Sequence, residues 1–184
     1  MITPENGILL LKMARSAIES HLHHRPAALP KEENPALWEK RGAFVSLKKG
    51  EELRGCIGRV EPTEPLIKTV SHVAVEAAFN DPRFTPLKEE ELQKVSLEVS
   101  VLSPLTKVRG LEEIQVGRDG LLVHRGFATG LLLPQVAIEN RWSKEEFLTY
   151  TCFKAGLPGG AWKEEGTDLY TFVAEVFSED RLHV

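Results

Sequence analysis

Short runs of alternating apolar and polar residues, separated by tight turns, constrain the fold of this chain more than any other feature. The clearest run covers residues 95–102, where every second residue is apolar. Such alternation is typical of a strand with one buried face. Residues 43–48 and 53–60 form two further runs, and Lys49-Gly50 between them predicts a hairpin turn. Strands joined by so short a connection pair antiparallel, so we expect an antiparallel sheet and not a parallel one.

Helical periodicity occupies much of the chain between these strands. Apolar residues recur at helical spacing over residues 4–23 and again over residues 65–80. Ser143 and Glu146 have the spacing of a capping box, which predicts a third helix that ends near Gly156. Helices interspersed among antiparallel strands predict an α+β fold, in which helices flank an antiparallel sheet.

Further strand signals lie in the second half of the chain. Residues 114–133 predict three short strands, with turns at residues 118–120 and at Arg125-Gly126. Residues 168–177 alternate between apolar and polar positions and predict one final strand. Both signals extend the antiparallel pattern toward the C-terminus.

Length and charge limit the classes of function. The chain has 184 residues, which is enough for one domain or two small lobes with a sizeable core. A net charge of −4 gives no general attraction to nucleic acid or to anionic membranes. This charge counts against a nucleic-acid partner, although a local basic patch would not be visible in the total.

The location of the protein is expected to be the cytoplasm. The sequence contains no secretory signal and no apolar stretch long enough to span a bilayer, so no membrane association is expected. The two cysteines, Cys56 and Cys152, form neither a disulfide framework nor a zinc-type pair. Reduced thiols fit a cytoplasmic protein. We see no metal site and no cofactor motif in the sequence.

The segment Leu-Arg-Gly-Cys-Ile-Gly at residues 53–58 is the main candidate for a functional site. Side chains two apart in a strand share a face, so Arg54 and Cys56 are expected to lie together. A guanidinium close to a thiol favours the reactive thiolate. Gly55 and Gly58 leave the backbone bare on either side. We therefore take Cys56 as the candidate catalytic residue, and Arg54 with the two glycines as candidate ligand contacts.

A nucleophilic cysteine needs a base within hydrogen-bond reach, and the sequence leaves the identity of this base open. His72 is either a helix-surface residue or a partner of Cys56, and His124 lies in a predicted strand from which it could face a ligand. Glu98 is either exposed to solvent or directed at the thiol. Arg83 either satisfies carbonyl groups where a helix ends or binds an anionic group of a ligand. No spacing among these residues establishes a catalytic triad.

The segment 53–58 also carries a resemblance to a known family. With the motifs that follow, the chain resembles the AMMECR domain family, whose members are also called protein A of the AmmeMemoRadiSam system. Besides residues 53–58, the similarity includes residues 42–45, 81–84, 97–104, 119–121, 130–136 and 152–157, together with Trp142 and Trp162. The resemblance implies a single AMMECR domain over residues 1–184. It also implies a larger lobe with both termini, a smaller inserted lobe, and a cleft between them that the signature side chains face.

Three hypotheses for function remain open. The family's system name implies that the protein works beside a Memo-type protein and a radical SAM enzyme in a modification pathway. In the first hypothesis, the protein binds an unknown small ligand in the implied cleft and acts with these partners. In the second, it is an enzyme that uses Cys56 on a small molecule. In the third, it is a regulatory factor in transcription, repair or translation. The first is preferred, because no base for Cys56 can be identified in the sequence.

Overall fold

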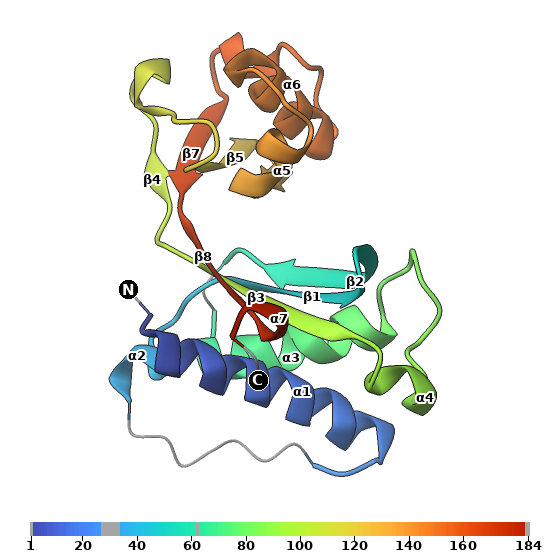
Figure 1. The fold of residues 1–184 in the computed structure, drawn as a ribbon. Coiled ribbons are helices and arrows are strands. Elements are labelled where there is room, and N and C mark those ends of the chain that lie inside the picture. Colours follow the sequence, from blue (N-terminus) through green and yellow to red (C-terminus); the bar gives the residue numbers. More distant parts are fainter. Residues whose placement is uncertain (1, 27–33, 62, 183–184) are drawn as a thin grey trace. The chain divides into compact units, whose positions relative to one another are not determined.

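The computed structural model describes residues 2–26, 34–61 and 63–182. The chain divides into two compact units, which consist of Met1–Leu102 with Glu175–Val184 and of Ser103–Ala174. Each unit contains one four-stranded sheet (Figure 1). The strand pairings with a described register are antiparallel, and helices accompany both sheets. This confirms the predicted α+β fold. The predicted cleft between lobes stays a prediction.

The first unit is built from both ends of the chain. Its helices are α1 (Pro4–Leu22), α2 (Pro35–Trp38), α3 (Leu66–Phe79), α4 (Glu89–Leu92) and α7 (Glu179–Leu182). Its strands are β1 (Ala43–Lys49), β2 (Glu52–Arg59), β3 (Ser96–Leu102) and β8 (Ala174–Ser178), in the sheet order β2-β1-β3-β8. The predicted hairpin is therefore confirmed as β1 and β2, and β2 lies at an edge of the sheet.

Helices α1 and α3 lie on the same face of this sheet (Figure 1). Local signals define α1, because the Thr3 hydroxyl accepts a hydrogen bond from the Asn6 backbone N–H and Pro4 occupies the first turn. The apolar stripes of both helices pack on the sheet in one core that includes Val45 and Val99, which are fully buried. This face of the sheet therefore supplies the packing of the first unit.

The alternation of β2 directs Cys56 to the other face. Gly55 faces α3 so closely that a Cβ atom on it would lie 2.1 Å from the carbonyl oxygen of Ala77. Ile57 packs against the same helical core. Cys56 lies between these two residues, so its side chain points to the face that α1 and α3 do not cover.

A bulge interrupts β2 at Arg54. Leu47 pairs with Gly55, but the next residue of β1, Lys48, pairs with Leu53. Arg54 is therefore the extra residue, and the rule that side chains two apart share a face does not extend across it. The sequence-based reason for placing Arg54 beside Cys56 was wrong for this strand.

The second unit contains a smaller sheet with two helices. Its strands are β4 (Thr106–Lys107), β5 (Gly120–Arg125), β6 (Ala128–Leu132) and β7 (Asp168–Phe172), in the order β4-β7-β5-β6, and its helices are α5 (Pro134–Glu139) and α6 (Lys144–Lys154). Short 3-10 helices occupy Leu111–Glu113 and Ala161–Lys163. The predicted capping box is confirmed, since Ser143 and Glu146 exchange hydrogen bonds at the start of α6.

Two sequence-based predictions about the second half of the chain were wrong. Residues 114–133 contain two strands, because residues 114–119 form a loop in which the Asp119 carboxylate accepts the Gln115 backbone N–H over 2.8 Å. Residues 168–177 are not one strand, because the chain changes sheets at Val173. The Val173 N–H donates to the Ser103 hydroxyl over 2.9 Å, and the Ser103 N–H donates to the Val173 carbonyl over 2.8 Å. Alternation continues through both strands and so cannot reveal the change of sheet.

Because α3 approaches β2 so closely, any side chain at residue 55 should destabilise the fold. We expect Gly55→Ala to lower the free energy of unfolding by about 1–3 kcal/mol, because the added methyl group must displace the Ala77 carbonyl. Gly160→Ala is the control, since nothing lies within 4 Å of a Cβ at Gly160 and its φ is −90°. Urea unfolding followed by circular dichroism measures both. Equal midpoints for the two variants would show that the helix contact does not require a glycine.

Candidate ligand-binding site around Cys56

Three side chains form a row across the face of the first sheet that α1 and α3 do not cover. Ser46 of β1 pairs with Cys56 of β2 on one side and with Glu98 of β3 on the other. The Ser46 hydroxyl donates to the Cys56 sulfur over 3.1 Å. Glu98 accepts a hydrogen bond from the Lys48 ammonium group over 3.1 Å, and its side chain is only 14% exposed. The row places a thiol, a hydroxyl and an ion pair on one polar surface.

Glu98 shares the face of Cys56 but does not lie against the sulfur. The two residues are two strands apart, which separates their backbones by about 10 Å. The group in contact with the sulfur is the Ser46 hydroxyl. A hydroxyl can orient a thiol, but it is too weak a base to take the thiol proton at neutral pH.

The backbone of Cys56 is held by two charged side chains from the loop after α3. An Asp81 carboxylate oxygen accepts the Cys56 N–H over 2.9 Å, and an Arg83 Nη2 donates to the Cys56 carbonyl over 3.1 Å. Arg83 also donates twice to Asp81, through Nε over 3.0 Å and Nη2 over 2.7 Å. Because β2 is an edge strand, its outward N–H and C=O groups lack a neighbouring strand. Asp81 and Arg83 satisfy these two groups at Cys56.

Electrostatics reinforce this arrangement. Hydrogen bonds from Arg83 hold the pKa of Asp81 far below its usual value, although burial of the carboxylate acts in the opposite direction. The same contact with Asp81 raises the pKa of Arg83, although burial of the guanidinium acts in the opposite direction. Arg83 is therefore a cation that contacts Cys56 through its backbone carbonyl. Its side chain remains 55% exposed, whereas Asp81 is 2% exposed.

Arg54, the cation that the sequence suggested, is engaged elsewhere. Its Nε and Nη2 donate to the two carboxylate oxygens of Glu91 in α4, each over 2.9 Å. This pairing lowers the pKa of Glu91 from 4.5 to about 2. Both Arg54 and Arg83 lie over the ring of Phe84, with guanidinium carbons 6.0 Å and 5.5 Å from its centroid. The motif at residues 81–84 was visible in the sequence, but nothing in it indicated contact with Cys56.

Packing explains the two glycines of the segment 53–58. Gly55 accommodates the Ala77 carbonyl of α3, as described above. Gly58 lies opposite Phe44, and a Cβ on it would be 2.2 Å from the Phe44 ring. Direct contact between either glycine and a ligand stays a prediction.

Neither histidine candidate is among the residues that contact Cys56 in the hydrogen bonds described above. His72 lies elsewhere in the first unit, and His124 belongs to the second unit. His72 is on α3, which covers the opposite face of the sheet, and its Nδ1 is 2.8 Å from a Glu64 carboxylate oxygen. His124 is on β5 of the second unit, where its Nδ1 is 3.0 Å from the Thr129 hydroxyl. Its proposed role beside a ligand stays a prediction. Cys152 belongs to the second unit's core, and burial raises the pKa of its thiol.

The part of the chain that the structure describes offers neither a group of three metal ligands nor a helix that could span a membrane. Within residues 2–26, 34–61 and 63–182, no three His, Cys, Asp or Glu side chains are grouped so that they could hold a metal ion. In the same part of the chain, every helix is too short or too polar to cross a membrane.

Acid should weaken the contact between Arg54 and Glu91. Glu91 has a lower pKa in the folded protein than the ordinary 4.5, so its ion pair stabilises the fold above that pH. This contribution should be lost as the pH falls from 4.5 toward about 2. We expect Glu91→Gln to lose less stability than the natural protein over this range, in urea unfolding at stepped pH. Glu90→Gln, at an exposed neighbour on α4, is the control and should follow the natural protein. Identical pH profiles for all three proteins would contradict the assignment.

Comparison with known proteins identifies the family. The AMMECR1 family model matches residues 11–177. Protein PF1979 of Pyrococcus furiosus is 48% identical, over 97% of this chain and 90% of that protein, and Protein TK0174 of Thermococcus kodakarensis is 45% identical, over 97% and 93%. The crystal structure of the uncharacterized protein PH0010 from Pyrococcus horikoshii is similar with a TM-score of 0.92 and 45% identity, over 97% of this chain and 94% of that one. This chain belongs to the AMMECR1 family.

Proposed function

We propose that this protein binds a small ligand with an anionic group beside Cys56, with Arg83 as the group that holds the anion. The observation that carries the proposal is the state of Arg83. Two of its nitrogens are fixed on Asp81, which orients the guanidinium, while more than half of the side chain is exposed. An oriented guanidinium next to a half-buried thiol fits a carboxylate, phosphate or sulfate group.

Binding fits the geometry better than autonomous catalysis. The sulfur of Cys56 contacts a serine hydroxyl, and the nearby carboxylate of Asp81 is fully engaged with backbone and guanidinium groups. Glu98 and Lys48 extend the polar surface along the same face and would contact a larger ligand. The second candidate is an enzyme that uses Cys56, which the guanidinium bonded to the carbonyl of the same residue favours. In that case, a partner would supply the base.

The wider role follows from the family resemblance. We propose that the protein acts in the cytoplasm with a Memo-type protein and a radical SAM enzyme in a modification pathway. The polar face around Cys56 supports this role, because a bound ligand there would be available to such a partner. The second unit's His124 remains a proposed ligand contact.

Alkylation of Cys56 by two related reagents tests the anion site. Iodoacetate and iodoacetamide react with the same thiol, but only iodoacetate carries a carboxylate. Because the intrinsic reactivity of the thiol enters both rates equally, the ratio of the two rates does not depend on it. We expect Arg83→Gln to lower this ratio about three- to tenfold, the loss of one charge-assisted contact. Mass spectrometry of the peptide that contains Cys56 gives both rates, so that Cys152 does not interfere.

Arg54→Gln is the matched control for this measurement. Arg54 is in the same strand as Cys56 but is paired with Glu91, so its loss should leave the ratio unchanged. If Arg83→Gln left the ratio unchanged as well, Arg83 would not hold the anion. If Arg54→Gln lowered it more than Arg83→Gln, the sequence-based assignment of the cation would be restored.

The partnership has its own test. Purified protein mixed with the Memo-type and radical SAM proteins of the same genome should form a complex detectable by light scattering after gel filtration. We expect Cys56→Trp to weaken this complex, because it fills the polar face. Lys163→Trp, at an exposed residue of the second unit, introduces the same bulky side chain in the unit that lacks Cys56 and is the control. Absence of any complex with the natural protein would remove the support for a shared pathway.

A further inference from the structure

Phe44 is an aromatic side chain on the same face of the first sheet as Cys56. It precedes Ser46 by two residues in β1, so the two side chains share this face, and it pairs with Gly58 of β2. Its side chain is half-buried. Among the described residues, it is neither a member of the two hydrophobic cores nor one of the side chains that pack against them. A partly exposed ring outside the core is a candidate contact for a ligand.

The Phe44 ring lies flat over Gly58. A Cβ atom on Gly58 would be 2.2, 2.2 and 2.6 Å from three consecutive carbons of this ring. Such similar distances indicate that Gly58 meets the face of the ring, because an approach at the ring edge would leave one of the three carbons clearly farther away. The backbone of β2 therefore covers one face of the ring, and the other face points away from the sheet.

A similar contact in the second unit shows what packing alone produces. A Cβ atom on Gly120 would lie 2.2 Å from the ring of Phe172, but Phe172 is buried, with only 2% of its surface exposed. Phe44 keeps more of its surface exposed. Contact with a glycine thus accounts for one face of the Phe44 ring and leaves the other face open to a partner.

The Phe44 ring and the Arg83 guanidinium lie at neighbouring positions of β2. The ring covers Gly58, and Arg83 donates to the Cys56 carbonyl over 3.1 Å. These positions are two residues apart, or about 7 Å along a strand. A ring stacked on Phe44 would lie one layer farther from the sheet than Phe44 itself. One molecule can therefore reach both contacts if a short linker separates its ring from its anionic group, and this linker would cover the Cys56 side chain.

We propose that the ligand of this site is a planar aromatic molecule with a carboxylate or phosphate on a short linker. Its ring stacks on Phe44, and its anionic group binds Arg83, so the inference rests on the anion site proposed above. Stacked aromatic rings gain a favourable geometry beyond the burial of apolar surface, and a puckered ring of the same size lacks it. The guanidinium supplies the contact with the anion.

Protection of Cys56 from alkylation by neutral iodoacetamide tests the proposal. Phenylpropionate and cyclohexylpropionate have the same charge and linker but carry a planar and a puckered ring. Phenethyl phosphate and cyclohexylethyl phosphate form the corresponding phosphate pair. We expect the planar member of at least one pair to protect at a concentration about three- to tenfold lower than its puckered counterpart. The pair that protects at lower concentration distinguishes a carboxylate ligand from a phosphate ligand.

Variants of Phe44 locate the ring. Phe44→Leu should bring the two members of each pair to nearly equal protection, because it keeps an apolar side chain but removes the aromatic face. Phe44→Tyr keeps the ring and should keep the preference for the planar member. Phe153→Leu removes a ring that is 55% exposed in the second unit, and as the control it should leave the preference unchanged.

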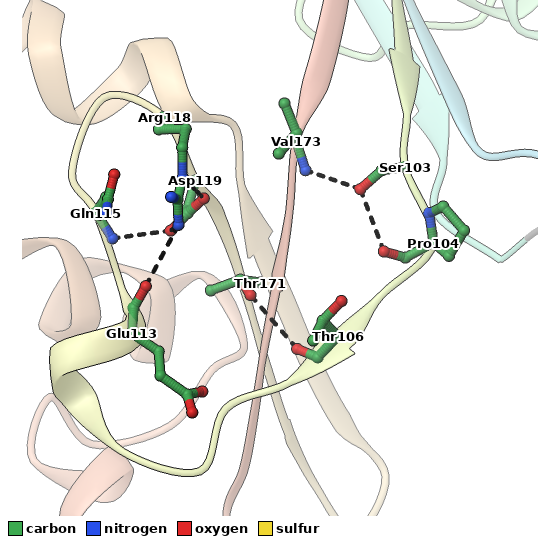
Figure 2. Close-up of polar contacts among 9 residues, drawn as sticks. All are labelled: Ser103, Pro104, Thr106, Glu113, Gln115, Arg118, Asp119, Thr171 and Val173. Carbon is green, nitrogen blue, oxygen red and sulfur yellow. Dashed lines mark hydrogen bonds and ion pairs between the residues drawn. The ribbon is translucent and has the colours of Figure 1, made fainter. Parts of the chain in front are cut away.

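Arg118 of the second unit provides the matched control for the anion contact. Figure 2 shows its guanidinium bonded to Asp119. Like Arg83, it donates through Nε and Nη2 to a buried carboxylate, and the two arginine side chains are 53% and 55% exposed. Arg83→Gln should weaken protection by all four compounds about tenfold. Arg118→Gln should weaken protection by none of them.

The outcomes separate this inference from the anion site on which it rests. Equal protection by both members of each pair, reduced in Arg83→Gln, would overturn the aromatic ligand and leave the anion site standing. A planar preference that persists in Phe44→Leu would overturn the assignment of the ring to Phe44. Protection that is unchanged in Arg83→Gln, or the absence of protection by all four compounds, would overturn the anion site and this inference with it.

Discussion

The carboxylate of Asp81 is the contact on which the Cys56 region depends. An edge strand exposes backbone groups that need partners, and a buried carboxylate without a cation would be costly. Asp81 meets the first need by accepting the Cys56 N–H, and Arg83 meets the second. The result is a charged pair that substitutes for a fifth strand at one position of the sheet. Because Asp81 is held at the end of α3, the position of Cys56 is tied to the helical core.

The sheet of the first unit separates packing from chemistry. One face takes α1 and α3 so closely that Gly55 has no room for a side chain. The other face has a polar row of Cys56, Ser46 and Glu98. Successive side chains of β2 point to opposite faces, so the same short segment allows close packing against α3 on one face and places Cys56 on the polar face. This explains why glycine and cysteine alternate there without requiring that every residue of the segment touch a ligand.

Features set by neighbouring residues could be predicted from the sequence. The β1 and β2 hairpin, the helices α1 and α3 and the capping box of α6 all follow from local spacing, and all are present. The family could also be identified, because its motifs are spread along most of the chain. The similar protein of known structure, PH0010, is itself described as uncharacterized, so membership alone does not give a reaction.

The features that could not be predicted depend on contacts between distant residues. Arg83 reaches Cys56 across 27 positions, while the nearer cation, Arg54, is diverted by a bulge to Glu91. No periodicity reports a bulge of one residue. The loop at residues 114–119 depends on the buried carboxylate of Asp119, which in the sequence was only part of a turn signal.

The paired hydrogen bonds between Ser103 and Val173 have a consequence for the order of folding. They join the two ends of the second unit, so that this unit, once folded, holds its own entrance and exit together. Strand β3 ends just before Ser103, strand β8 begins just after Val173, and the two strands are neighbours in the first sheet. Pairing them directly would require closing a long loop, at an entropic cost that grows with loop length. If the second unit forms early, it brings the end of β3 and the start of β8 together. Strand β8 can then pair with β3 as the second strand of a hairpin does.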